Sequence, residues 1–145
     1  FTIKKDGVPC PCGNRGCYEQ YASTTALVKK VQEAFPELDS TVIDGKYIFQ
    51  EIQAGNTAIK NIAKNWITDI AAGLIGLIHI FNPQRVIVGG GVSQQQELFI
   101  EPLRQAVLSG VMPCFRENLT LCAAELGNHA GLLGAVKYHI TETEC

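Results

Sequence analysis

Apolar residues recur at three- and four-residue intervals in several stretches of the chain, a spacing that is typical of helices. These stretches are residues 18–35, 45–54, 57–81, 97–108 and 130–140. Pro36 ends the first stretch, and a possible cap within residues 23–25 leaves open whether this stretch forms one helix or two. Asn82 and Pro83 end the longest stretch.

The longest predicted helix is apolar around more than one face. Its apolar positions cover more than the roughly 100° arc that a helix needs to face a single core. We therefore expect the helix to be largely buried, with Trp66 and Ile70 shielded from water. Apolar surface left over would pack against the C-terminal helix or a second subunit, which predicts a homodimer.

Short, uniformly apolar runs indicate strands between the helices. Residues 86–88 are β-branched and lead into three glycines, which predicts a strand buried on both faces of a sheet. Residues 119–123 form a second such run, and residues 1–3 are a plausible strand remnant. Because strands alternate with helices, the fold class is α/β with a largely parallel central sheet.

Size and charge exclude several classes of protein. The chain has 145 residues, enough for one domain, with 46% hydrophobic residues, 18% charged residues and a net charge of -2. It has no clustered basic face for nucleic acid and no apolar run long enough to span a membrane. The first residues lack both an initiator Met and an apolar signal region, so we expect the middle of a longer chain.

The six cysteines are unevenly distributed. Cys10, Cys12 and Cys17 lie within eight residues, whereas the others are scattered and predicted to be inert: Cys114, Cys122 and Cys145. This distribution does not fit a secreted disulfide scaffold; it fits a local metal site in a reducing cytoplasm. Gly13 and Gly16 allow a tight return that brings Cys17 onto the other two thiols.

Thiolates in this arrangement favour zinc, which they bind in a tetrahedron. Residues 10–17 therefore form a candidate zinc knuckle that supplies three ligands and requires a fourth from elsewhere. A closed site of this kind is structural, because it leaves no open position for water. The alternative is three free thiols that lie close together incidentally.

Three motifs in order resemble one known family. Residues 10–23 read Cys-Pro-Cys-Gly-Asn-Arg-Gly-Cys-Tyr-Glu-Gln-Tyr-Ala-Ser, which resembles the Cys-x-Cys-Gly-x-x-Gly-Cys-x-Glu signature of the ROK family of bacterial sugar kinases and sugar-responsive repressors. Residues 86–92 resemble its strand ending in Gly-Gly-Gly-Val, and residues 130–135 its Ala-Gly-Leu-Leu-Gly-Ala motif. The resemblance covers essentially the whole chain. It implies the C-terminal lobe of an actin-like ATPase (ribonuclease H-like) fold.

The resemblance also implies roles for particular residues. Glu19 would accept hydrogen bonds from sugar hydroxyls, although a carboxylate that only stabilises a helix N-terminus is the alternative. Gly89, Gly90 and Gly91 would border the nucleotide, with a simple tight turn as the alternative. The fourth zinc ligand would be a His about ten residues before Cys10, at or before residue 1. The catalytic Asp would also lie outside the chain, in the N-terminal lobe.

The predicted function is ATP-dependent phosphorylation of a hexose or N-acetylhexosamine by the full-length protein, with Mg²⁺ on the phosphates and structural zinc in the knuckle. The chain by itself is expected to be inactive. The sugar, ATP and a second subunit are the expected partners, in the cytoplasm. One alternative is the sugar-sensing domain of a ROK repressor, and another is a zinc-stabilised interaction module.

Overall fold

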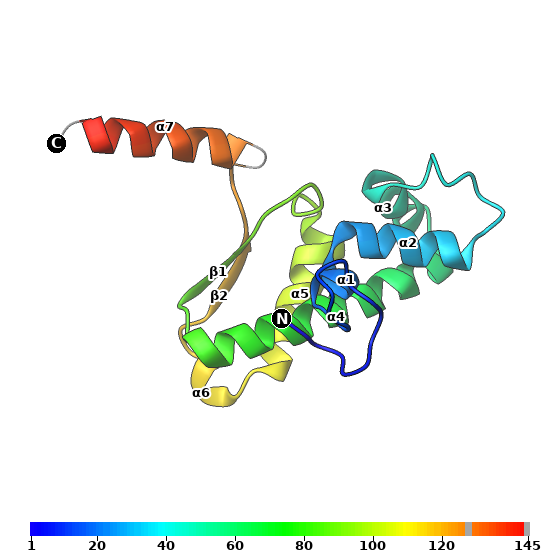
Figure 1. Ribbon diagram of the computed structural model, residues 1–145, viewed down its shortest axis with the longest axis horizontal. Coiled ribbons are helices and arrows are strands. Elements are labelled where there is room, and N and C mark those ends of the chain that lie inside the picture. The colour runs from blue at the N-terminus through cyan, green and yellow to red at the C-terminus, as the bar shows by residue number, and fades with distance from the viewer. Residues whose placement is uncertain (127–128, 144–145) are drawn as a thin grey trace.

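The structure is a computed structural model that describes residues 1–126 and 129–143 (Figure 1). Its elements are α1 (Glu19–Ala22), α2 (Thr24–Ala34), α3 (Gly45–Gln53), α4 (Thr57–Phe81), β1 (Arg85–Val88), the π-helical turn η1 (Gln96–Ile100), α5 (Glu101–Gly110), α6 (Pro113–Arg116), β2 (Thr120–Ala123) and α7 (Ala130–Thr143). The mixture of helices with paired parallel strands confirms the α/β class.

Side-chain caps fix where the N-terminal helices begin. The question of one helix or two is resolved as two, because Ser23 is extended and its hydroxyl accepts a hydrogen bond from the Ala26 N–H at 3.1 Å. Asp44 caps α3 through the Tyr47 N–H at 2.7 Å, and Asn56 caps α4 in the same way.

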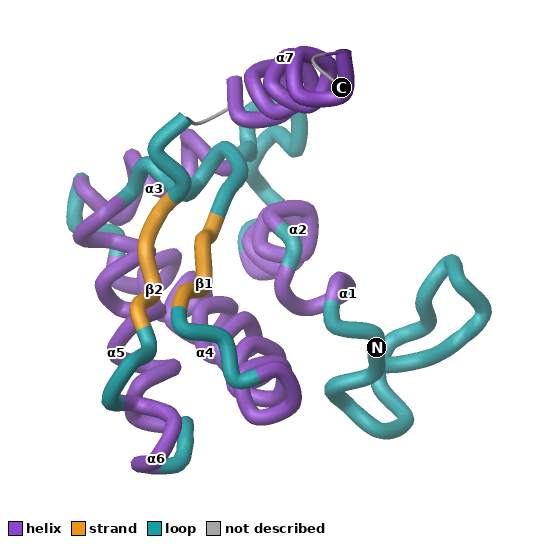
Figure 2. The backbone as a smooth tube through the Cα atoms, turned by 90° about the vertical axis from the view of Figure 1, so that its left-hand side faces the viewer, coloured by secondary structure: helices purple, strands orange, loops and turns teal. Residues whose placement is uncertain are grey.

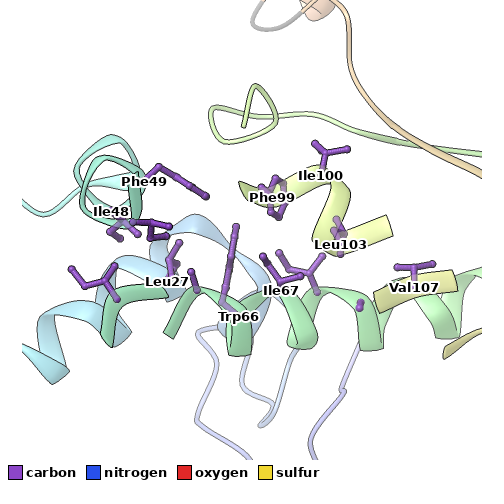
Figure 3. Packing of buried hydrophobic residues seen from close by; sticks show 14 of the residues in the cluster. Leu27, Ile48, Phe49, Trp66, Ile67, Phe99, Ile100, Leu103 and Val107 are labelled. Atoms are coloured by element: carbon purple, nitrogen blue, oxygen red, sulfur yellow. The ribbon is translucent and has the colours of Figure 1, made fainter. Parts of the chain in front are cut away.

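Helix α4 is the centre of the core, as its apolar pattern predicts. Trp66 is 1% exposed and Ile70 is 7% exposed, so the predicted burial of these two side chains is confirmed, whereas Ile80 and Phe81 at the end of α4 are exposed. The Trp66 ring stacks on Phe99 of η1 with centroids 5.0 Å apart (Figure 3). Its indole N–H donates to the carbonyls of Ala22 and Ser23 at the α1–α2 junction. The other large, fully buried side chains come from α4 itself and from α2, α3, η1, α5 and β2. No helix in the described part of the chain is long and apolar enough to cross a membrane.

Strands β1 and β2 pair in parallel, with Val86 opposite Leu121 and Val88 opposite Ala123. Figure 2 shows the two strands side by side. The prediction that residues 86–88 are buried on both faces is wrong for this chain. Val86 and Val88 are half-buried against the core, but Ile87 points the other way and is 62% exposed. A β-branched run indicates a strand, but the number of strand faces that are buried depends on which other elements pack against them.

Three further elements differ from their predictions. Residues 1–3 form a single antiparallel bridge, between Thr2 and Cys17, and not a strand. The helix predicted at residues 97–108 begins as the π-helical turn η1 and continues as α5. Helix α7 lies apart from α4 in Figure 1, so α7 does not cover the remaining apolar surface of α4. The predicted homodimer contact stays a prediction.

Candidate functional site

The thiol loop, residues 8–17, brings Cys10, Cys12 and Cys17 together. Their Sγ atoms all lie within 4.8 Å of one another, and those of Cys12 and Cys17 are 3.5 Å apart. Cys12 is exposed, Cys10 is half-buried and Cys17 is 8% exposed. The cluster therefore has one open side and one side closed by protein.

Local backbone hydrogen bonds and two left-handed glycines make this geometry. The Cys10 N–H donates to the Asn14 carbonyl at 2.9 Å, and the Gly13 N–H donates to the Cys10 carbonyl at 3.0 Å. Gly13 has φ 90° and Gly16 has φ 69°, a region that side chains with a Cβ rarely adopt. A Cβ at Gly16 would also collide with the Lys4 carbonyl. The predicted tight return through both glycines is confirmed.

The three thiols fit three corners of a tetrahedral zinc site. Zn–S bonds of about 2.3 Å require sulfur–sulfur distances of about 3.8 Å, which the observed spacing reaches with sub-ångström to ångström shifts. Among residues 1–126 and 129–143, no His, Asp, Glu or further Cys joins the cluster. The described part of the chain thus offers three candidate metal ligands.

Cys12 and Cys17 differ in proton affinity. The Asn14 backbone N–H, assisted by the neighbouring thiols, lowers the pKa of Cys12 from 9.0 to about 7. The hydrogen bond with Cys12, together with burial, raises the pKa of Cys17 to about 11. Cys12 therefore becomes a thiolate, the form that binds metals and electrophiles, more readily than Cys17 does.

The thiol loop is held against α4 by contacts just outside the cysteines. The Tyr18 hydroxyl donates to the Ile70 carbonyl at 2.8 Å, and burial raises the pKa of Tyr18 to about 12. Asp69 accepts from Lys4 at 3.0 Å and from Lys30 at 2.8 Å, which ties the N-terminal segment and α2 to the same carboxylate. The position of the loop is thus fixed by the core helix.

Glu19, the predicted sugar ligand, is the exposed first residue of α1. It lines an open hollow of about 530 Å³ together with Val8 and Pro9 of the thiol loop and residues of α2. The carboxylate is therefore next to the thiol loop and accessible. Because Glu19 is also the first residue of a helix, it can equally act as a charge that stabilises the helix N-terminus. The geometry therefore permits both the sugar-binding role and the helix-stabilising role.

The predicted nucleotide glycines form a turn at the carboxyl end of β1. Gly90 has φ 104°, and a Cβ at Gly90 or Gly91 would meet no atom within 4 Å. Ser93 closes the turn: it is fully buried, and its hydroxyl donates to the Gly90 carbonyl at 2.8 Å. The turn therefore has open space in front of its backbone and a fixed support behind it.

The sequence analysis missed the residues that face this turn. Helix α3 and the turn line one hollow of about 530 Å³, formed by Thr24, Gly45, Lys46, Phe49, Gly91, Val92 and Gln95. Residue 45 is a glycine where a Cβ would lie 3.2 Å from the Thr24 methyl and 3.5 Å from Val92. Thirty-five residues, 54–88, lie between the end of α3 and the turn, so no local spacing signals the hollow.

The remaining cysteines and histidines do not join either site within the described residues. Cys114 is exposed in α6 and Cys122 is half-buried in β2. His79 stacks on Phe115 with ring centroids 5.0 Å apart and accepts from the Met112 N–H. Cys145 lies outside the described residues.

An α/β domain with a three-thiol loop at one end and a glycine turn after a parallel strand has clear relatives. The model of the ROK family matches residues 1–142. A glucokinase of Thermotoga maritima is 34% identical over 92% of this chain and 45% of its own length. A xylose repressor of Bacillus spizizenii is 30% identical over 92% of this chain and 34% of its own length.

A solved structure matches as well. The crystal structure of a ROK family glucokinase from Streptomyces griseus, in complex with glucose and AMPPNP, aligns with a TM-score of 0.83 and 33% identity over 95% of this chain. The match covers 49% of that glucokinase. The chain belongs to the ROK family. It spans about half the length of the curated glucokinases that it matches.

Proposed function

We propose that the full-length protein transfers the γ-phosphoryl group of ATP to a hydroxyl of a hexose or an N-acetylhexosamine. The observation that carries this proposal is the likeness to glucokinases, at 34% identity in sequence and a TM-score of 0.83 to a structure with glucose and an ATP analogue. In phosphoryl transfer the protein mainly positions the reactants and balances charge, with Mg²⁺ on the phosphates. The catalytic Asp would lie in the half of the family's length that this chain does not span.

The sugar-binding, nucleotide-binding and metal-binding residues of the candidate site would have separate roles. Glu19 would accept sugar hydroxyls as a charged acceptor, and the backbone of Gly89, Gly90 and Gly91 would border the nucleotide. A zinc ion on Cys10, Cys12 and Cys17 would be structural and would hold the loop next to Glu19. An upstream His would complete that zinc site.

The direct test is a panel of hexoses and N-acetylhexosamines with ATP, using the full-length protein and measuring ADP release. Glu19→Gln should raise the sugar KM or lower kcat/KM by about 10- to 100-fold, because a charged hydrogen bond is lost. Glu33→Gln is a matched control, since Glu33 lines the same hollow from α2 but lies farther from the thiol loop in sequence. Equal kinetics for the two variants would show that Glu19 is only a charge at a helix end.

The metal proposal has its own test. Elemental analysis of the full-length protein should find about one zinc per chain, and Cys12→Ser should lose most of it. Cys114→Ser is the matched control because Cys114 is also exposed but belongs to α6. Full zinc occupancy in the Cys12→Ser variant would contradict the proposed ligand set.

The second candidate function is the sugar-sensing part of a ROK repressor, which the xylose repressor match supports. A repressor would bind sugar without phosphorylating it and would have a DNA-binding domain in the full-length protein. Sugar-dependent DNA binding without ADP release from any sugar would favour this alternative.

A further inference from the structure

The hollow beside the thiol loop is lined by both acids and lysines. Glu19 and Glu33 lie there together with Lys29 and Lys30 of α2. A lysine ammonium on its flexible stem pairs readily with a carboxylate in reach, and an oxygen that accepts from an ammonium has less capacity left for another donor. A carboxylate that is to accept hydrogen bonds from sugar hydroxyls must therefore be kept free of these lysines.

Both lysines of the hollow have a partner other than Glu19. In the part of the chain that the structure describes, Glu19 belongs to none of the ion pairs. The Lys29 ammonium pairs with Glu33 at 3.8 Å. The Lys30 ammonium pairs at 2.8 Å with Asp69, which lies on α4 and is not among the residues that line the hollow. The Glu19 carboxylate is therefore left open to a ligand.

The two ion pairs differ in their exposure to water. The side chains of Lys29 and Glu33 are 72% and 65% exposed, so water solvates both charges and their pairing is weak. The side chains of Lys30 and Asp69 are only 30% and 17% exposed. Because the Lys30 ammonium is partly removed from water, it needs a carboxylate partner more than Lys29 does.

Asp69 pairs with a second lysine, which responds differently to its loss. In the described part of the chain no other acid pairs with two lysines. The second lysine, Lys4, has its ammonium 4.3 Å from the centroid of the Tyr21 ring and does not line the hollow. Without the Asp69 charge, Lys4 keeps its contact with the ring. Lys30 keeps no partner, and the acids of the hollow become its nearest alternatives.

We propose that Asp69 is a positioning residue for the sugar site, because it holds the Lys30 ammonium away from the Glu19 carboxylate. This inference rests on the proposed role of Glu19 in sugar binding. Asp69 acts only through Lys30, since it does not itself line the hollow. Without the Asp69 charge, Lys30 pairs with Glu19, and this pair has to be broken before a sugar hydroxyl can donate to Glu19.

The test uses the full-length protein with the variants Asp69→Asn, Lys30→Met and the two combined. Asp69→Asn keeps the shape of the side chain and removes its charge. It should raise the sugar KM by about 2- to 5-fold, the range of an ion pair near the surface, with kcat and the KM for ATP unchanged. Adding Lys30→Met should return the sugar KM to the wild-type value, because no ammonium is left to occupy Glu19. Lys30→Met alone should leave the sugar KM unchanged.

The combined variant separates positioning from stability. If Asp69 only stabilises the fold, the combined variant lacks the same ion pairs, and its sugar KM stays as high as that of Asp69→Asn. This result would overturn the proposal. Glu33→Gln is the matched control, because it removes the partner of Lys29 in the same hollow. That pair is exposed, so the sugar KM should not change, and a rise equal to that of Asp69→Asn would also refute the assignment.

Calorimetry with glucose and with N-acetylglucosamine distinguishes failure of this proposal from failure of the kinase function. If the wild-type protein binds one of these sugars but phosphorylates none, the proposed function is wrong, and the sugar Kd of the same variants decides the role of Asp69. If Glu19→Gln weakens sugar binding and Asp69→Asn does not, the sugar site stands and the assignment of Asp69 is wrong. A wild-type protein that binds no sugar overturns both.

Discussion

A single methyl group added to α4 should test whether the thiol loop depends on the core helix. Gly73 is buried, and an ideal Cβ there would lie 2.6 Å from two carbons of the Tyr18 ring and nearer still to a third. The ring cannot move aside freely. Its hydroxyl donates to the Ile70 carbonyl at 2.8 Å and its face stacks on Phe1 with centroids 5.0 Å apart.

The expected size of the effect follows from three contributions. Replacing Gly by Ala inside a helix stabilises it by about 1 kcal/mol. Overpacking against a ring costs about 1–3 kcal/mol, and losing the Tyr18 hydrogen bond costs about 0.5–1.5 kcal/mol. Gly73→Ala should therefore lower the free energy of unfolding by about 0.5–3.5 kcal/mol.

Gly76 provides the matched control on the same helix. It is exposed, and a Cβ there would meet no atom within 4 Å, so Gly76→Ala should stabilise the protein by about 0.5–1 kcal/mol. Urea unfolding of both variants, followed by circular dichroism, measures the difference. The zinc content would report directly on the conformation of the thiol loop, because Tyr18 immediately follows Cys17, one of the proposed zinc ligands. If Gly73→Ala is as stable as Gly76→Ala and keeps the same zinc content, the contact between Tyr18 and α4 does not hold the loop.

Three further predictions concern the core, the turn and the thiols. Trp66→Phe should lower the free energy of unfolding by about 1–3 kcal/mol, because two carbonyls lose their indole donor; unchanged urea unfolding would contradict this. Ser93→Ala should raise the KM for ATP more than the KM for sugar in steady-state kinetics, because the hydroxyl that supports the glycine turn is removed; equal changes would show a general loss of fold. In the metal-free protein, alkylation of Cys12 should rise between about pH 6 and 8 as its thiolate forms, whereas Cys17 should stay unreactive until about pH 10. Mass spectrometry would separate the two sites, and identical pH profiles would contradict the assigned pKa values.

Features that depend on near neighbours in the chain could be predicted from the sequence. The return through Gly13 and Gly16 is local, because each glycine supplies a left-handed φ within a few residues of the cysteines. The predicted extent of α4 was also correct, because the 3.6-residue period and both ends of the helix, Thr57 and Phe81, belong to one continuous segment of the sequence. The location of Trp66 in the core follows from the same period.

Only the tertiary structure decided which distant segments meet. The burial of β1 depends on the elements beside it, so a β-branched run could not show that Ile87 is exposed. The hollow at the glycine turn is lined in part by Lys46, which lies on α3 some forty residues earlier. Beside the thiol loop, Lys4 pairs with Asp69 of α4 and the Tyr18 hydroxyl donates to the Ile70 carbonyl of α4. Spacing along the chain determines local conformation, whereas packing determines which side chains from separate elements come within contact distance. The clustering of Cys10, Cys12 and Cys17 could therefore be predicted from sequence, whereas the residues from distant elements that position the loop could not.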